Sequence, residues 1–82
     1  MQERSTNRAS SIQDVVAISA RQLAEMLSVS LRQIWRLNSA GKVPKPIRLG
    51  GSVRWDRDEI LRWFKDGCPD RGTWEARNEV AK

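Results

Sequence analysis

Apolar residues recur with a helical period in three segments of the chain, and this pattern is the main guide to its fold. In the first segment the apolar positions follow the i, i+3, i+4, i+7 spacing of a helix with one buried face. The second and third segments show shorter versions of the same spacing. The predicted core positions are Ala20, Leu23, Ala24 and Leu27, then Ile34 and Leu37, then Ile60, Trp63 and Phe64.

Each segment opens with the same local motif: an apolar residue, then Ser or Asp, then Gln or Glu three positions later. The pairs are Ser19 with Gln22, Ser30 with Gln33, and Asp56 with Glu59. In a capping box the first side chain accepts a backbone N–H at the helix start, and the second reaches back to the cap. We therefore predict three short helices. The first two are joined by a tight turn, and the second ends at Gly41.

A β-hairpin is predicted between the second and third helices, because Pro44 and Pro46 exclude further helix. A two-residue turn at Gly50-Gly51 would set Arg48 opposite Val53. A three-residue turn, from Gly50 to Ser52, instead pairs Leu49 with Val53, Arg48 with Arg54 and Ile47 with Trp55. The longer turn separates apolar from basic residues, so we predict that register, with one core face and one face carrying two arginines.

These elements predict a mainly α fold with a small β-hairpin: a winged helix-turn-helix of three short helices, with the wing between helices 2 and 3. We assign residues 14–66 to this domain. Residues 1–13 are polar and are expected to form a flexible tail. Residues 67–82 are expected to be a weakly structured extension or a short helix capped by Thr73, with Trp74 exposed.

Positive charge is concentrated in one part of the chain. From Ser30 to Arg57 there are seven cationic residues and one acidic residue, a net +6, whereas the whole chain carries +5. Charge that is localised in this way is typical of a surface that follows nucleic-acid phosphates. We therefore expect a nucleic acid as the partner.

Composition argues against several other classes of protein. One cysteine and no histidine leave neither a disulfide framework nor a plausible zinc site, so no metal or other cofactor is expected. A chain of 82 residues is too short to enclose a deep pocket for a small-molecule substrate. No apolar run approaches the roughly 20 residues that span a bilayer, so we expect a cytoplasmic protein without membrane contact. The carboxylates Asp56, Asp58 and Glu59 fit a cap and a first helical turn, so we do not expect an enzyme.

The second helix of a helix-turn-helix enters the major groove, and this places the candidate DNA-binding residues. Arg32 can bind guanine, while Gln33 either pairs with adenine or serves only the cap. Trp35 is either a core residue or a phosphate donor, and Leu31 is interpreted as core. Lys42 and Lys45 are interpreted as phosphate contacts, and Arg48 and Arg54 as wing residues, because directly opposed arginines repel unless an anion lies between them. The full predicted set is Ser30, Arg32, Gln33, Trp35, Arg36, Lys42, Lys45, Arg48 and Arg54.

The stretch from Ile18 to about Lys65 resembles the excisionase and AlpA-like regulators of the MerR-like winged helix-turn-helix superfamily. The matching motifs are Leu23-Ala24, Leu27-Ser28-Val29-Ser30, Ile34-Trp35-Arg36-Leu37, Gly41, Pro44, Gly50-Gly51 and Arg54-Trp55. The resemblance implies a bacterial, phage or mobile-element origin and places Ser30, the positions after it and the Trp35-Arg36 pair on DNA. The chain departs from the family at Leu31-Arg32-Gln33, at Ser52, where Arg is common, and at Asn38, where an apolar residue is usual.

The predicted function is sequence-specific binding of double-stranded DNA by a small transcriptional regulator. The alternative is an excisionase-type recombination directionality factor that bends attachment-site DNA, with an integrase or a second copy of the chain as its partner on DNA. A third hypothesis, a protein-binding adaptor, depends on Trp74 being exposed.

Overall fold

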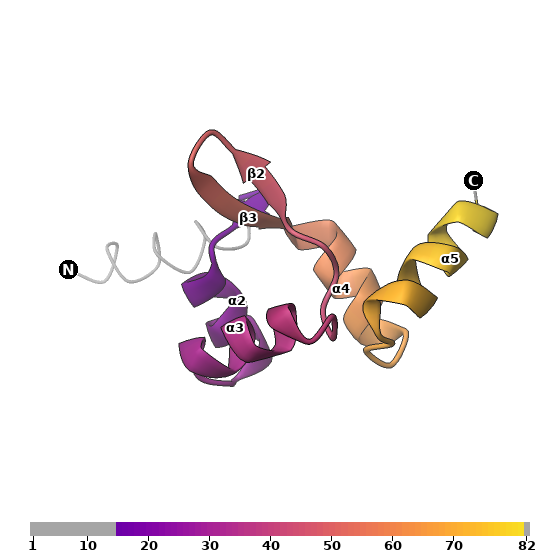
Figure 1. The fold of residues 1–82 in the computed structure, drawn as a ribbon, viewed down its shortest axis with the longest axis horizontal. Helices are drawn as coiled ribbons and strands as arrows, with labels where there is room; N and C mark the ends of the chain where they lie inside the picture. The colour runs from indigo at the N-terminus through magenta and orange to yellow at the C-terminus, as the bar shows by residue number, and fades with distance from the viewer. Residues whose placement is uncertain (1–14, 82) are drawn as a thin grey trace, which may run out of the picture.

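The computed structural model describes residues 15–81, so the tail predicted for residues 1–13 lies outside it. The elements in chain order are β1 (Ala17–Ile18), α2 (Ala20–Leu27), α3 (Leu31–Ser39), β2 (Ile47–Leu49), β3 (Ser52–Asp56), α4 (Arg57–Lys65) and α5 (Arg71–Ala81). Figure 1 shows the β2–β3 hairpin beside α2 and α3, and α5 at the opposite end of the molecule.

The three predicted helices begin at the predicted caps, but only one of the three capping boxes is complete. At α2, Ser19 Oγ accepts from Gln22 N, and Gln22 Oε1 accepts from Ser19 N. At α4, the Asp56 carboxylate accepts from the backbone N–H groups of Asp58 and Glu59. The Glu59 carboxylate does not reach back to the cap but accepts from the Trp74 indole. A distant partner has therefore replaced the local one.

The core lies between the first three helices and one face of the sheet. Its largest fully buried side chains include Trp55, Ile18, Leu23, Ile34 and Ile60. Leu27 and Leu37 are only partly buried at its margin. The prediction that Phe64 belongs to the core is wrong. Phe64 is 58 % exposed, because Trp63 already fills the inward position of that helical turn.

The sheet has three antiparallel strands in the order β1-β3-β2. Strand β1, which the sequence did not predict, pairs Ile18 with Trp55. Because β1 covers one edge of β3, the hairpin is tied to the start of α2 as well as to its own turn.

The predicted hairpin register is wrong. The turn has two residues, and the pairs are Ile47 with Arg54, Arg48 with Val53 and Leu49 with Ser52. Gly50 has φ +63° and Gly51 has no positive φ, which is the pattern of a type II′ turn, a favoured two-residue connection. The prediction assumed that Ile47 and Leu49 are buried, but they are 46 % and 56 % exposed on the uncovered face of the ribbon.

The C-terminal segment forms an ordered helix. Its cap is Asp70, whose carboxylate accepts from Thr73 N, so the assignment of Thr73 as the cap is wrong. Trp74 is 5 % exposed and donates to Glu59 at 2.8 Å, which removes the exposed aromatic on which the adaptor hypothesis depended. With α2, α3 and α4 present and a hairpin between α3 and α4, the predicted winged helix-turn-helix is confirmed.

Candidate nucleic-acid interface

One face of α3 is turned to solvent over its whole length. Ile34 is buried on the opposite face, while Arg32, Trp35, Arg36 and Ser39 are exposed. These four residues follow i, i+3, i+4 and i+7, so they form one continuous strip along the helix, the α3 stripe. The stripe places two arginines one turn apart with an indole beside them, and arginine is a side chain that can bind guanine in the major groove.

The start of α3 holds the other two predicted helix residues. Ser30 is the exposed N-cap, and its Oγ accepts from Gln33 N at 3.0 Å. The reciprocal bond from the Gln33 amide to the cap, seen in α2, is not formed within residues 15–81. The side-chain amide of the half-buried Gln33 therefore does not serve the cap, so it can bond to a ligand.

Trp35 combines the two roles that the sequence left open. Its ring packs against the buried Trp55 at a centroid distance of 6.0 Å and a tilt of 53°, yet the residue is 41 % exposed. Trp55, Trp63 and Trp74 each donate their indole N–H to an oxygen at 2.8 Å. Among residues 15–81, Trp35 has no such acceptor, so its donor is available to a ligand.

Lys42 and Lys45 lie on either side of a buried anchor in the loop after α3. Val43 and Pro44 are buried, and the Pro44 carbonyl accepts from the Trp55 indole at 2.8 Å. Both lysines are exposed. The pKa of Asp70 is lowered chiefly by hydrogen bonds from Thr73 and, to a lesser extent, by the charge of Lys42, so Lys42 already has an acidic neighbour.

Arg48 and Arg54 do not share a face of the wing, which corrects the predicted pair of arginines. Arg48 lies opposite Val53, and Arg54 lies opposite Ile47. Arg48 is exposed, whereas Arg54 is partly buried and donates from NH1 to the Val53 carbonyl at 2.8 Å. The two cations therefore act at different places on the hairpin.

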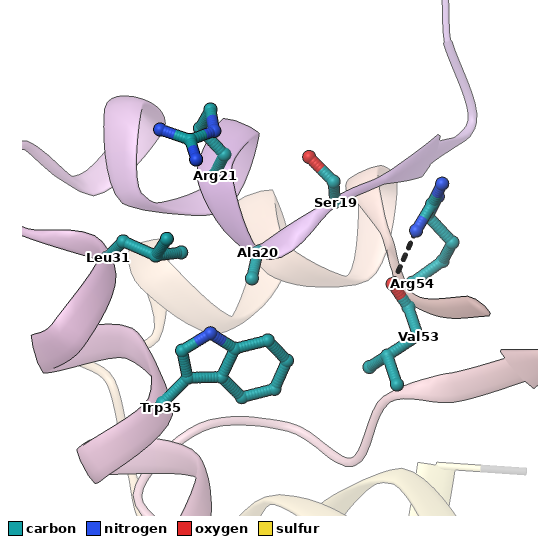
Figure 2. Close-up of a pocket in the computed structure, with 7 residues that line it drawn as sticks. All are labelled: Ser19, Ala20, Arg21, Leu31, Trp35, Val53 and Arg54. Carbon is teal, nitrogen blue, oxygen red and sulfur yellow. Dashed lines mark hydrogen bonds between the residues drawn. The ribbon is translucent and has the colours of Figure 1, made fainter. Parts of the chain in front are cut away.

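An open cleft of about 390 Å³ lies between the start of α2, α3 and β3 (Figure 2). It is lined by Ser19, Ala20, Arg21, Leu31, Trp35, Val53 and Arg54. Sequence reasoning missed Arg21, because residues 1–29 carry three arginines and three acidic residues and so have no net charge. The apolar pattern of α2 puts Arg21 on the outer face, but no local signal places it near β3.

The end of α3 is held by α5 through Arg71. Its Nε donates to the Val43 carbonyl at 3.0 Å, and its NH2 donates to Asn38 Oδ1 at 2.8 Å and to the Asn38 carbonyl at 3.3 Å. The Arg71 backbone N–H also bonds to Gly41 O at 2.9 Å. Asn38, which stands where the resembled family has an apolar residue, therefore has a charged partner 33 positions away.

The three carboxylates near the start of α4 are all engaged by neighbouring groups. Asp56 caps the helix, Asp58 pairs with Arg57 at 3.3 Å, and Glu59 accepts from Trp74. Among residues 15–81, no helix combines the length and apolar character that crossing a membrane requires.

Residues 18–68 match the family model of the helix-turn-helix domain. The match covers more than half of the chain and includes α2, α3, both hairpin strands and α4, but not α5. No curated protein and no solved structure matches the chain. The α3 stripe lies on the second helix of the helix-turn-helix, which is the helix that enters the major groove in this motif. The chain belongs to the helix-turn-helix domain family and binds DNA.

Proposed function

We propose that this protein is a transcriptional regulator that reads double-stranded DNA sequence-specifically and without catalysis. In this proposal α3 lies in the major groove, and the hairpin lies against the flanking backbone or minor groove. We place the domain among the excisionase and AlpA-like regulators of the MerR-like superfamily, acting in the cytoplasm of a bacterium or on behalf of a phage or mobile element. The observation that carries the proposal is the α3 stripe, because it presents Arg32 and Arg36 away from the core on a helix whose position is fixed by Ile34.

Arg32 and Lys45 should have separable roles. Arg32 lies in the first turn of α3, where side chains meet base edges, and Lys45 lies in a loop, where a side chain meets the backbone. Arg32→Ala should weaken binding by about 1 to 3 kcal/mol and remove the preference at one base pair. Lys45→Ala should weaken all sequences alike and reduce the salt slope by about one.

Selection from a randomised duplex pool, followed by titration of the selected duplex at several salt concentrations, tests these expectations. With about four to six phosphates neutralised, log K against log salt should have a slope of roughly −4 to −5 for the parent. Lys65→Ala, an exposed cation on α4, is the matched control and should leave the affinity unchanged. A parent slope near zero would refute DNA binding by this surface, and full sequence preference in Arg32→Ala would refute α3 as the reading helix.

A recombination directionality factor that bends DNA for an integrase is the second candidate. It is favoured by the exposed apolar side chains Ile47 and Leu49 on the wing, because apolar residues that insert between base steps kink the duplex. Circular-permutation gel shifts with the parent and Leu49→Ser distinguish the two candidates. A large bend that is lost in Leu49→Ser would favour the recombination factor, and a small bend in both proteins would favour the regulator.

A further inference from the structure

The cleft between α2, α3 and β3 lies where the two DNA-facing parts of the molecule meet. Trp35 belongs both to the α3 stripe and to the cleft lining, and Arg54 brings the hairpin to the opposite wall. The lining includes two arginines and no acidic residue. Within residues 15–81 neither arginine forms an ion pair, whereas Arg57 and Arg77 do.

The geometry of double-stranded DNA indicates which part of a bound duplex would lie in the cleft. A sugar–phosphate strand separates the major groove from the neighbouring minor groove. If α3 lies in the major groove and the hairpin faces the adjacent minor groove, that strand must cross between α3 and β3, where the cleft opens. This step rests on the proposed function, because it takes α3 as the reading helix and the hairpin as the wing.

The chemistry of the cleft matches one unit of such a strand. Its floor is apolar, formed by Ala20, Leu31, Trp35 and Val53, which suits the face of a deoxyribose. Figure 2 shows Arg21 and Arg54 on opposite sides of Ala20, with the Trp35 ring below Ala20 and between Leu31 and Val53. Cationic guanidinium groups beside an indole N–H suit the attached phosphate.

The first turn of α2 adds little to anion binding by itself. The capping box already uses Ser19 Oγ as an acceptor and the Ser19 N–H as a donor. What remains for a ligand is the Ser19 hydroxyl proton and the backbone N–H groups of Ala20 and Arg21, together with side chains from three elements. The cleft is therefore built by tertiary packing and does not depend on the helix terminus.

We infer that this cleft is a backbone seat: it holds one deoxyribose and its phosphodiester from the DNA strand that separates the two grooves. Arg21 and Arg54 bind the phosphate from two sides, and the Trp35 indole N–H donates to it. Arg21, from a segment with no net charge, thereby becomes part of the DNA-binding surface.

The test compares Arg21→Ala with Arg62→Ala, which removes an exposed arginine from α4, outside the cleft. On the selected duplex, Arg21→Ala should weaken binding about tenfold and reduce the salt slope by about one without changing base preference. Arg62→Ala should change the affinity less than twofold. Trp35→Phe keeps an aromatic ring, although a smaller one, and removes the N–H donor, and it should weaken binding about fivefold with an unchanged salt slope.

Neutral methylphosphonates, placed one at a time along both strands, locate the contact. At one position the parent should lose at least tenfold in affinity, whereas Arg21→Ala should lose only about threefold, because only the Arg54 and Trp35 contacts to that phosphate remain in the variant. Equal losses for parent and variant at every position would overturn the seat, as would an Arg21→Ala effect no larger than that of Arg62→Ala. A stronger effect of Trp35→Phe on single-stranded than on duplex DNA would overturn it too, in favour of a base-stacking surface. A parent that shows no salt-dependent duplex binding would instead refute the proposed function, so the two failures are distinguishable.

Discussion

Removing the Arg71 side chain should destabilise the fold far more than removing another arginine from the same helix. Arg71→Ala deletes hydrogen bonds of 3.0 Å to Val43 O and 2.8 Å to Asn38 Oδ1, and a longer one of 3.3 Å to Asn38 O. A hydrogen bond from a charged donor contributes about 1.5 to 3 kcal/mol when its surroundings are dry. Arg71 is only partly buried and the third bond is long, so we expect a loss of about 2 to 3 kcal/mol in the free energy of unfolding.

This loss is large for a small domain. Natural proteins have roughly 0.05 to 0.15 kcal/mol of stability per residue, which for a chain of 82 residues is roughly 4 to 12 kcal/mol. For a domain of this size each kcal/mol shifts Tm by roughly 4 to 8 °C, so Arg71→Ala should lower Tm by roughly 8 to 24 °C. Urea and thermal unfolding followed by tryptophan fluorescence measure both quantities.

Arg77→Ala is the matched control, because Arg77 lies on α5 and pairs with Asp66 on the surface. An exposed ion pair contributes about 0 to 1 kcal/mol, so this variant should stay close to the parent. The cycle of Asn38→Ala, Arg71→Ala and the double variant should give a coupling energy of about 1 to 2 kcal/mol. If Arg71→Ala proves no more destabilising than Arg77→Ala, the argument that α5 holds the end of α3 is refuted.

Three further variants test individual features of the fold and its lone thiol. Gly50→Ala should destabilise by about 1 to 2 kcal/mol in urea unfolding because of its φ of +63°, while Gly51→Ala should change stability by less than about 0.5 kcal/mol; equal effects would contradict the type II′ turn. Phe64→Ser should change stability by less than about 1 kcal/mol, whereas Ile60→Ala should cost about 2 to 4 kcal/mol; similar losses in the same assay would place Phe64 in the core after all. Partial burial raises the pKa of the Cys68 thiol, so a thiol reagent should react with it more slowly at pH 7 than with free cysteine, and faster as the pH rises. Cys68→Ser should leave the affinity for duplex DNA unchanged in a gel shift, and a loss of affinity would reveal a redox or dimerising role for the thiol.

The parts of the fold that the sequence predicts are those set by neighbouring residues. Ser19, Ser30 and Asp56 begin helices because a short oxygen side chain satisfies backbone donors two or three positions away. The apolar spacing then orients each helix, which is why Leu23, Ile34 and the other central core positions were predicted correctly. These signals depend on only a few neighbouring residues, so tertiary contacts elsewhere in the chain do not change them.

The predicted hairpin register is wrong because apolar segregation and turn chemistry favour different registers for this sequence, and the structure follows turn chemistry. Segregation of apolar from basic residues assumes a covered face, but Ile47 and Leu49 lie on the side of the ribbon that nothing in the described chain covers. The turn rule depends only on Gly50, which adopts a positive φ without strain. For an edge strand that extends past the core, turn chemistry is the better guide to register.

The remaining features join residues far apart in the sequence and leave only faint local signals. A polar Asn38 at an apolar position was a visible clue, but nothing in the sequence identified Arg71 as its partner. Arg21 and Arg54 come to the same cleft only because β1 pairs with β3 and brings the start of α2 beside the hairpin. No periodicity encodes such contacts.

The observed register also changes how the wing can meet DNA. Opposed arginines on one face would have repelled each other and favoured a hairpin that forms fully only around a bound anion. With Arg48 opposite Val53 and Arg54 opposite Ile47, that repulsion is relieved, and Trp55 and β1 hold the strand from behind. We therefore expect the hairpin to keep this register in the free protein and on DNA, so that binding need not include the entropy loss of ordering it. Its two cations are then free to make separate contacts, Arg54 beside the α3 stripe and Arg48 on the outer part of the wing.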